Sequence, residues 1–257
     1  MVFGLHTYMG AVHGVHLKYV AASALCATAS NHYSHRAVDD AGQAVYFSFE
    51  AIAMLLLLYS AIVHAVISAL FIARRGEWIL GKRPTTGEVP LWSYIIYAPF
   101  HLPTWLYTYL HTEHSKRNGV PVASEVAAGW WIGGRYGAEL GKRWAATIDL
   151  TVEFPEGCRA TTDEYLLLAC WDGTPPSARS IERAARLAAE ASTRGDVMVH
   201  CAHGRGRSTC VMVACLVRAG LYENWREAFA AVSKRRRGVK LNGKMMRALD
   251  EWERLAK

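Results

Sequence analysis

The chain has 257 residues, enough for one domain of ordinary size and a further segment beside it. Its formal charge of +7 favours an acidic partner, such as phosphate, anionic lipid or nucleic acid, without choosing among them. The six cysteines form no CxxC pair and show no regular spacing, which argues against a disulfide framework and a zinc site and favours a reducing compartment.

The hydrophobic residues, which make up 52% of the chain, are concentrated in its first half. Residues 51–73 form a run without formal charge that is followed at once by Arg74 and Arg75. At about 1.5 Å per residue, this run is long enough to cross the roughly 30 Å hydrocarbon core of a bilayer. We predict a transmembrane helix here, with a buried core helix as the alternative, and we expect His64 within it to be neutral and to face another helix.

Two further segments of the first half are apolar enough to meet a membrane. Residues 7–29 are interrupted only by Lys18 and two histidines, and we predict a second span there. Residues 89–110 carry no formal charge but contain three prolines and many Trp and Tyr residues, which favours a re-entrant or surface-lying segment over a straight span. The sequence therefore predicts a membrane-anchoring region over 1–120 and a separate domain over 121–257.

The distribution of charge predicts which side of the membrane this domain occupies. Four basic residues follow the main span: Arg74, Arg75, Lys82 and Arg83. The preceding loop at 31–50 carries Arg36 against three acidic residues. Positive loops stay inside, so we expect two spans, both termini inside and the C-terminal half facing the cytoplasm. A third span at 89–110 would invert this orientation.

The C-terminal half has the pattern of an α/β domain, in which a central, mostly parallel sheet is flanked by helices. Short apolar runs alternate with segments of helical periodicity from about residue 124. We predict strands at 130–134, 146–150 and 196–200, and an amphipathic helix at 177–191.

The strand at 196–200 leads into a glycine-rich loop that is followed by an apolar helical run at 210–217. Backbone N–H groups of such a loop turn inward, and the helix N-terminus behind them adds a positive dipole end, so that a phosphate dianion is held. Glycines permit the unusual dihedrals that this arrangement needs. We predict a phosphate-binding loop formed by Ala202, His203, Gly204, Arg205, Gly206 and Arg207, with His200 and Thr209 in support.

Three side chains of this loop suit nucleophilic attack on a phosphate. The field that holds an anion also favours a thiolate, and a cysteine in such a setting has a pKa of roughly 3.5 to 7.5, which makes Cys201 a nucleophile. The guanidinium of Arg207 is suited to grip two phosphate oxygens at once. Ser208 is placed to hydrogen-bond the sulfur and help it leave, with Thr209 as the alternative.

A leaving group also needs a proton donor from another loop, and Asp172 is the candidate. It lies in a Gly- and Pro-containing turn after the apolar run at 165–169. The alternative reading is a turn aspartate, in which case Asp163 or Asp196 would be the acid. Cys170 beside it is either packed or able to protect Cys201 by a reversible disulfide.

From about residue 125, the chain resembles the dual-specificity branch of the protein-tyrosine phosphatase superfamily. The signature of this family is His, Cys, five residues, Arg and Ser or Thr, which His200, Cys201, Arg207 and Ser208 match. The resemblance implies phosphate monoester hydrolysis through a cysteinyl-phosphate, without a metal or cofactor.

Two other motifs are similar to the phosphatases of regenerating liver within that branch: Asp-Gly-x-Pro-Pro from Asp172, and Arg-Arg-Gly-x-x-x-Asn from Arg236 to Asn242. One feature of the superfamily is missing. Met245 and Met246 stand near the place where classical tyrosine phosphatases carry the glutamine that positions the hydrolytic water.

The substrate class stays open in the sequence. Arg205 stands where lipid phosphatases of the superfamily carry a basic residue, whereas Ala202 replaces the lysine that follows their cysteine. We rank phosphotyrosine, phosphoserine and phosphothreonine proteins first and an acidic phospholipid headgroup second. A phosphate-binding pseudophosphatase comes last, because Cys201, Arg207 and Asp172 are all retained.

The basic run 234–237 follows a helix that Asn224 is expected to cap. It is placed either to steer an anionic substrate or to form a solvated helix end. No aromatic residues are interleaved with it, so nucleic acid is not expected as a partner.

Overall fold

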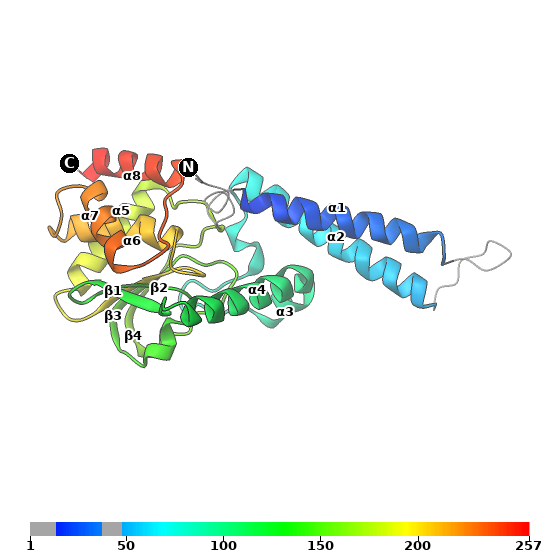
Figure 1. Cartoon of the computed structure of the whole chain (residues 1–257), viewed down its shortest axis with the longest axis horizontal. Helices are drawn as coiled ribbons and strands as arrows, with labels where there is room; N and C mark the ends of the chain where they lie inside the picture. Colours follow the sequence, from blue (N-terminus) through cyan, green and yellow to red (C-terminus); the bar gives the residue numbers. More distant parts are fainter. Residues whose placement is uncertain (1–13, 38–47, 257) are drawn as a thin grey trace.

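A computed structural model describes residues 14–37 and 48–256 of the chain. Two helices, α1 (Val15–Ser34) and α2 (Phe49–Ala73), lie along one another as a hairpin that projects from an α/β part (Figure 1). The short helix α3 (Leu91–Ile96) and the longer α4 (Ala98–Arg117) lie beside the sheet, below the base of the hairpin in the view of Figure 1.

The α/β part is built on one five-stranded sheet with the order β1-β2-β5-β3-β4. Only the pair β1–β2 is antiparallel, and the other three pairs are parallel. The strands are β1 (Ala123–Ala127), β2 (Trp130–Gly133), β3 (Trp144–Asp149), β4 (Thr162–Leu167) and β5 (Val197–His200). The predicted α/β fold with a mostly parallel sheet is therefore confirmed, and the three predicted strands correspond to β2, β3 and β5.

Four helices gather on one side of this sheet (Figure 1): α5 (Ala178–Ala191), α6 (Arg207–Arg218), α7 (Trp225–Arg235) and α8 (Gly243–Ala256). The predicted amphipathic helix is α5, which Ser177 caps by accepting a hydrogen bond from the N–H of Ser180. Its buried face consists mostly of alanines, and such small side chains permit a close approach to its neighbours. The predicted cap Asn224 likewise accepts hydrogen bonds from the first turn of α7.

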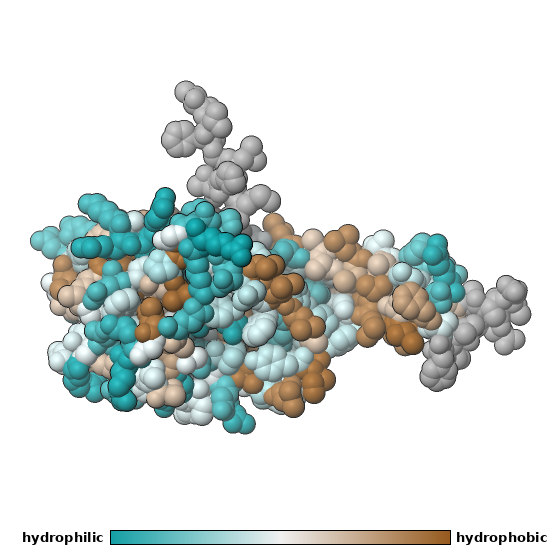
Figure 2. All heavy atoms as spheres, turned by 60° about the horizontal axis from the view of Figure 1, so that its bottom comes forward, coloured by the Kyte–Doolittle hydropathy of each residue, from teal (hydrophilic) through white to brown (hydrophobic). Residues whose placement is uncertain are grey.

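Among the described residues, α2 is the one helix that is long and apolar enough to cross a membrane, judged by length and composition alone. Many of its large side chains are exposed: Phe49, Ile52, Leu55, Leu56, Leu58, Ile62, Val66 and Ile72. The surface in Figure 2 shows hydrophobic residues along the hairpin, whereas the opposite end of the molecule is largely hydrophilic. The length and composition of α2 agree with the predicted span at 51–73.

The predicted second span at 7–29 is not supported. Residues 7–13 lie outside the described residues, and α1 over its described length does not reach the same hydropathy. This helix is rich in small and polar residues and contacts α2 through hydroxyl groups. Ser23 Oγ donates to the carbonyl of Ala61 and Ser30 Oγ to that of Met54, each at 2.9 Å.

The segment 89–110, predicted to lie at a surface, forms α3 and most of α4 with a break at Tyr97. Pro103 lies inside α4, so proline does not end this helix. The two helices expose several large apolar side chains: Leu91, Trp92, Ile95, Ile96, Leu102, Trp105, Leu106, Tyr109 and Leu110.

The helices of the first half share a hydrophobic cluster with the α/β part. Tyr19 of α1, Phe71 of α2 and Phe100 of α4 pack with Trp171, which follows β4 and is fully buried. The ring centroids of Phe71 and Trp171 are 4.6 Å apart, and Trp171 Nε1 donates to the carbonyl of Arg75 at 2.9 Å. Side-chain packing therefore crosses the boundary that we predict at residue 120.

Candidate active site

The glycine-rich loop joins the carboxyl end of β5, the central strand of the sheet, to the N-terminus of α6. All four residues of β5 are buried. Gly204 has a φ of +69°, and a Cβ there would lie 2.5 Å from the backbone carbon of Gly133. Only glycine fits this turn of the loop.

Cys201 lies at the base of this loop and is 4% exposed. Its Sγ is 3.4 Å from Ser208 Oγ. Burial opposes ionisation, but Arg207 and the hydrogen bonds from Ser208 outweigh it, so that the pKa of Cys201 lies below its ordinary value. Thr209 donates its hydroxyl to the carbonyl of Arg205 at 2.9 Å, so Ser208 is the hydroxyl that contacts the sulfur.

Arg207 is buried and held by a partner that the sequence pattern does not indicate. Its guanidinium donates to Glu153 Oε1 at 2.7 Å and to the carbonyls of Leu150 and Cys170 at 3.0 and 2.8 Å. Burial disfavours the charged form, but the Glu153 and Asp172 carboxylates raise the pKa of Arg207 well above its ordinary value. Its Nε has no hydrogen-bond partner among the described residues and is a buried donor available to an anion.

Asp172 lies beside this arginine, as its predicted role requires. Its Oδ1 is 3.4 Å from Arg207 Nη2. Burial raises the pKa of Asp172, and the opposing effect of Arg207 is smaller, so the carboxyl group retains its proton to higher pH than an exposed aspartate does. The loop is fixed by Asn242, whose Nδ2 donates to the carbonyl of Gly173 at 2.8 Å.

The two fallback acids lie elsewhere. Asp163 pairs with Arg143 at 2.7 Å and Asp196 with Lys142 at 2.6 Å. Asp163 lies near the start of β4, and Asp196 directly precedes β5. In parallel strands this is the edge opposite Cys201, so neither carboxylate is placed to protonate a leaving group.

Cys170 is buried, and its Sγ lies 3.5 Å from the carbonyl of Leu150. Its own carbonyl accepts a hydrogen bond from Arg207 at 2.8 Å. The backbone of Cys170 thus helps to hold Arg207 whether or not its thiol is oxidised. A protective disulfide with Cys201 stays a prediction.

Two basic residues differ from the expectation. Arg205, predicted to bind substrate, turns instead toward α4, where its guanidinium contacts His111 Nε2 at 3.0 Å and Ser115 Oγ at 3.1 Å. Arg236, which we placed in a solvated or steering run, is buried. It donates to the carbonyls of Gly204 and His203 at 2.8 and 3.1 Å and therefore holds the backbone of the loop.

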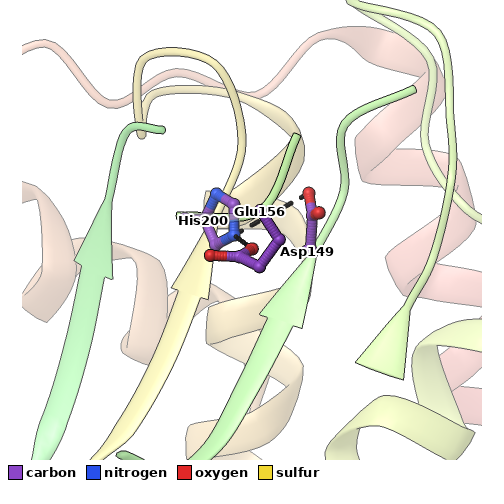
Figure 3. Close-up of side chains that lie close together, drawn as sticks. All are labelled: Asp149, Glu156 and His200. Carbon is purple, nitrogen blue, oxygen red and sulfur yellow. Dashed lines mark hydrogen bonds and ion pairs between the residues drawn. The ribbon is translucent and has the colours of Figure 1, made fainter. Parts of the chain in front are cut away.

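His200 belongs to a buried charge cluster beneath the loop, shown in Figure 3. Its Nε2 is 2.5 Å from Glu156 Oε2 and 3.7 Å from Asp149 Oδ1 (Figure 3). Burial would lower the pKa of His200, but the two carboxylates raise it to about 9. Although these three residue types are able to bind a metal, Asp149 already accepts hydrogen bonds from the Lys82 ammonium and the Tyr165 hydroxyl. We therefore interpret the cluster as a structural support for the loop, in which Lys82 and His200 balance the negative charges of the two carboxylates.

Helices α1 and α4 form a wall over the phosphate loop. A small cavity of about 20 Å³ lies there. Its lining includes Ala202, His203 and Asp172 together with Lys18 of α1 and Tyr107 of α4. The Lys18 ammonium lies 5.6 Å from the centroid of the Tyr107 ring and makes no ion pair within residues 14–37 and 48–256. No motif near the loop predicts this wall, because helices far upstream in the chain supply it.

Comparison with known proteins supports the class of this site. Residues 176–255 match the family described as dual specificity phosphatase, catalytic domain. The matched range includes Cys201, Arg207 and Ser208, whereas Asp172 lies just before it. Over these residues the chain is therefore similar to a cysteine-based phosphatase domain. None of the curated proteins compared with the chain matches it.

Several solved structures are similar to about half of the chain. The structure of Tk-PTP in its active form is 26% identical, with 52% of this chain and 97% of that chain covered and a TM-score of 0.47. Human DUSP28 is 20% identical, with 53% and 95% covered and a TM-score of 0.46. PTPMT1 in complex with PI(5)P is 19% identical, with 52% and 96% covered and a TM-score of 0.44.

Proposed function

We propose that the protein is a membrane-anchored phosphatase that hydrolyses phosphate monoesters through a cysteinyl-phosphate. The observation that carries this proposal is the meeting of Cys201, Arg207 and Asp172 at the carboxyl edge of the sheet. A thiolate, a guanidinium and a protonated carboxyl group are the nucleophile, anion clamp and acid that the reaction needs.

In the first step, the Cys201 thiolate attacks phosphorus and the bond to the leaving oxygen breaks. Asp172 gives its proton to that oxygen, and Arg207 balances the charge of the transferring group. In the second step, water attacks phosphorus while the S–P bond breaks. The Asp172 carboxylate takes the proton of the water, and Ser208 stabilises the departing thiolate. No other residue is assigned to position the water.

The proposed anchoring rests on α2 and on the residues after it. Its exposed apolar side chains are followed by Arg74 and Arg75, which is the charge pattern of a helix whose end faces the cytoplasm. The catalytic part then lies in a reducing space, where the thiol of Cys201 stays free.

For the substrate, we place an acidic phospholipid headgroup ahead of a phosphoprotein, which reverses the order that the sequence suggests. Lys18 and Tyr107 wall the space above the loop, and both belong to helices that adjoin the apolar surface of the hairpin and α3. A substrate held in a bilayer would reach the loop along this wall. A phosphoprotein stays the second candidate, because Arg205 is turned away and Ala202 adds no charge to the loop.

Replacing Lys18 with alanine tests this order. The full chain in mixed micelles is expected to hydrolyse a phosphatidic acid with a higher kcat/KM than a phosphotyrosine peptide, and the variant should lower that ratio about tenfold, the effect of one charge-assisted contact. Lys234→Ala, which removes an exposed lysine of α7, is the matched control. A higher kcat/KM for the peptide in the unmodified chain would favour the phosphoprotein.

Asp172→Asn is expected to lower kcat by about 10²- to 10⁴-fold with a phenyl phosphate, as for the loss of a general acid. The acid form of Asp172 is the active one and its pKa is raised, so activity should fall as pH rises through that pKa. The variant should lose this descending limb of the pH profile. Asp163→Asn serves as the control. An unchanged profile in Asp172→Asn would assign the acid to another group.

A further inference from the structure

A second, larger cavity shares Asp172 and Phe71 with the small cavity that Lys18 lines. Its volume is about 260 Å³. The start of α1, the end of α2 and the start of α8 enclose it, and Asp172 and Gly173 form one side. The phosphatase mechanism uses none of the side chains that α8 contributes.

Basic side chains concentrate at this cavity without acidic partners. Lys244 and Arg247 of α8 line it, and Arg74 at the end of α2 is close enough to repel Lys244. Burial lowers the pKa of Lys244, and the charges of Arg74 and Arg247 lower it further. Within residues 14–37 and 48–256, none of the three makes an ion pair, since the ion pairs of that part of the chain involve other basic residues.

Like charges repel, so a cluster of this kind is stabilised when an anion enters it. Asp172 is the one acidic residue of the described lining. Its Oδ1 lies 3.4 Å from Nη2 of Arg207, so its negative charge is matched by that cation. The net field in the cavity is therefore positive.

The position of the cavity indicates which anion enters. Arg74 directly follows the apolar helix α2, and Ile72 beside it is exposed. Basic residues at the cytoplasmic end of such a helix lie at the level of lipid headgroups. Val15 and Phe71 add apolar side chains to the lining, which suits the glycerol end of a lipid better than a free inorganic ion.

We propose that this cavity binds the phosphate of an anionic phospholipid headgroup through Lys244 and Arg247. The inference rests on the membrane anchoring proposed above and is independent of the chemistry at Cys201. Asp172 lines both cavities, and Asn242 ties its loop to α8 through the hydrogen bond to Gly173. A lipid bound here would hold the acid-bearing loop against α8 at the membrane surface.

The test is a calorimetric titration of the full chain in a neutral detergent with dihexanoyl phosphatidylglycerol. This lipid is a phosphodiester, so the enzyme has no monoester to hydrolyse. We expect saturable binding that the double variant Lys244→Ala/Arg247→Ala weakens at least tenfold. Arg254→Ala removes one positive charge from the same helix outside the cavity and should bind as the unmodified chain does. Hydrolysis of an aryl phosphate should be within about twofold of normal in all these proteins.

Two results would overturn the inference. The first is phosphatidylglycerol binding that the double variant leaves unchanged or that Arg254→Ala weakens equally. The second is that inorganic phosphate binds as tightly as the lipid and that the double variant weakens both equally. The cavity would then be a site for free phosphate. An inactive unmodified chain would instead count against the proposed phosphatase function, because the titration does not depend on turnover.

Discussion

Cys201→Ser is expected to lower kcat for an aryl phosphate by about 10⁴-fold or more, the scale of losing a nucleophile. Arg207 and Ser208 hold the pKa of the Cys201 thiol below its ordinary value in spite of burial, so the sulfur attacks as a thiolate. A serine hydroxyl in the same place would stay protonated at neutral pH. Steady-state turnover measures the loss of kcat, and acid quench traps the phosphoenzyme. No phosphate should be bound covalently to the variant.

Cys26→Ser is the control for this experiment, because Cys26 lies on α1 and is only partly buried. Its activity should stay within about twofold of the unmodified chain. A phosphoenzyme that forms in Cys201→Ser, or a loss of activity that Cys26→Ser shares, would contradict the assignment of the nucleophile.

The features that the sequence predicts well are those that a short segment encodes. The apolar run 196–200 and the glycines after it specify a buried strand, a tight loop and a helix N-terminus in succession, and the structure has them in that order. The loop at Asp172 is similar, because its Gly and Pro residues mark a turn whatever surrounds it.

The partners that hold the site together have no such signal, because each lies far away in the sequence. Glu153 is 54 positions from Arg207, and His111 is 94 positions from Arg205. A single Glu or His without a motif looks like any surface residue. Only the folded structure shows that His111 contacts Arg205 and that Glu153 contacts Arg207.

Arg236 illustrates the same limit for charge. In the sequence it is one of four consecutive basic residues and has the pattern of a solvated helix end. In the structure, α7 ends just before it, and its side chain turns inward to the carbonyls of the phosphate loop, whereas Lys234, Arg235 and Arg237 are exposed. A run of like charges therefore predicts that its residues are exposed, but it does not indicate which of them is buried.

The second large effect is expected at Lys82, which links the first half of the chain to the sheet. Its ammonium contacts the carboxylate of Asp149 at the end of β3, and both side chains are at most 1% exposed. Burial alone would raise the pKa of Asp149, but Lys82 and His200 hold it well below its usual range. Lys82→Met would remove the nearer of the two cations that face this buried carboxylate, which costs about 3–5 kcal/mol in the free energy of unfolding.

Denaturant unfolding of the full chain in a neutral detergent measures this loss. Arg83→Met removes the neighbouring exposed cation, which pairs with Glu88 at 3.1 Å, and should cost less than about 1 kcal/mol. The double variant Lys82→Met/Asp149→Asn removes both charges and should recover part of the loss, whereas a double variant less stable than Lys82→Met would contradict the pairing.

The pH dependence has a defined sign. The pKa of Asp149 is lowered in the folded state, so the stability that the pair contributes is present at neutral pH and declines as pH falls toward that pKa. The difference between the unmodified chain and Lys82→Met should therefore shrink in acid. Because Asp149 neighbours His200 in the sheet register and His200 precedes the nucleophile, Lys82→Met should also lower kcat. A residue of the anchoring half would then be needed for both the stability and the activity of the phosphatase half.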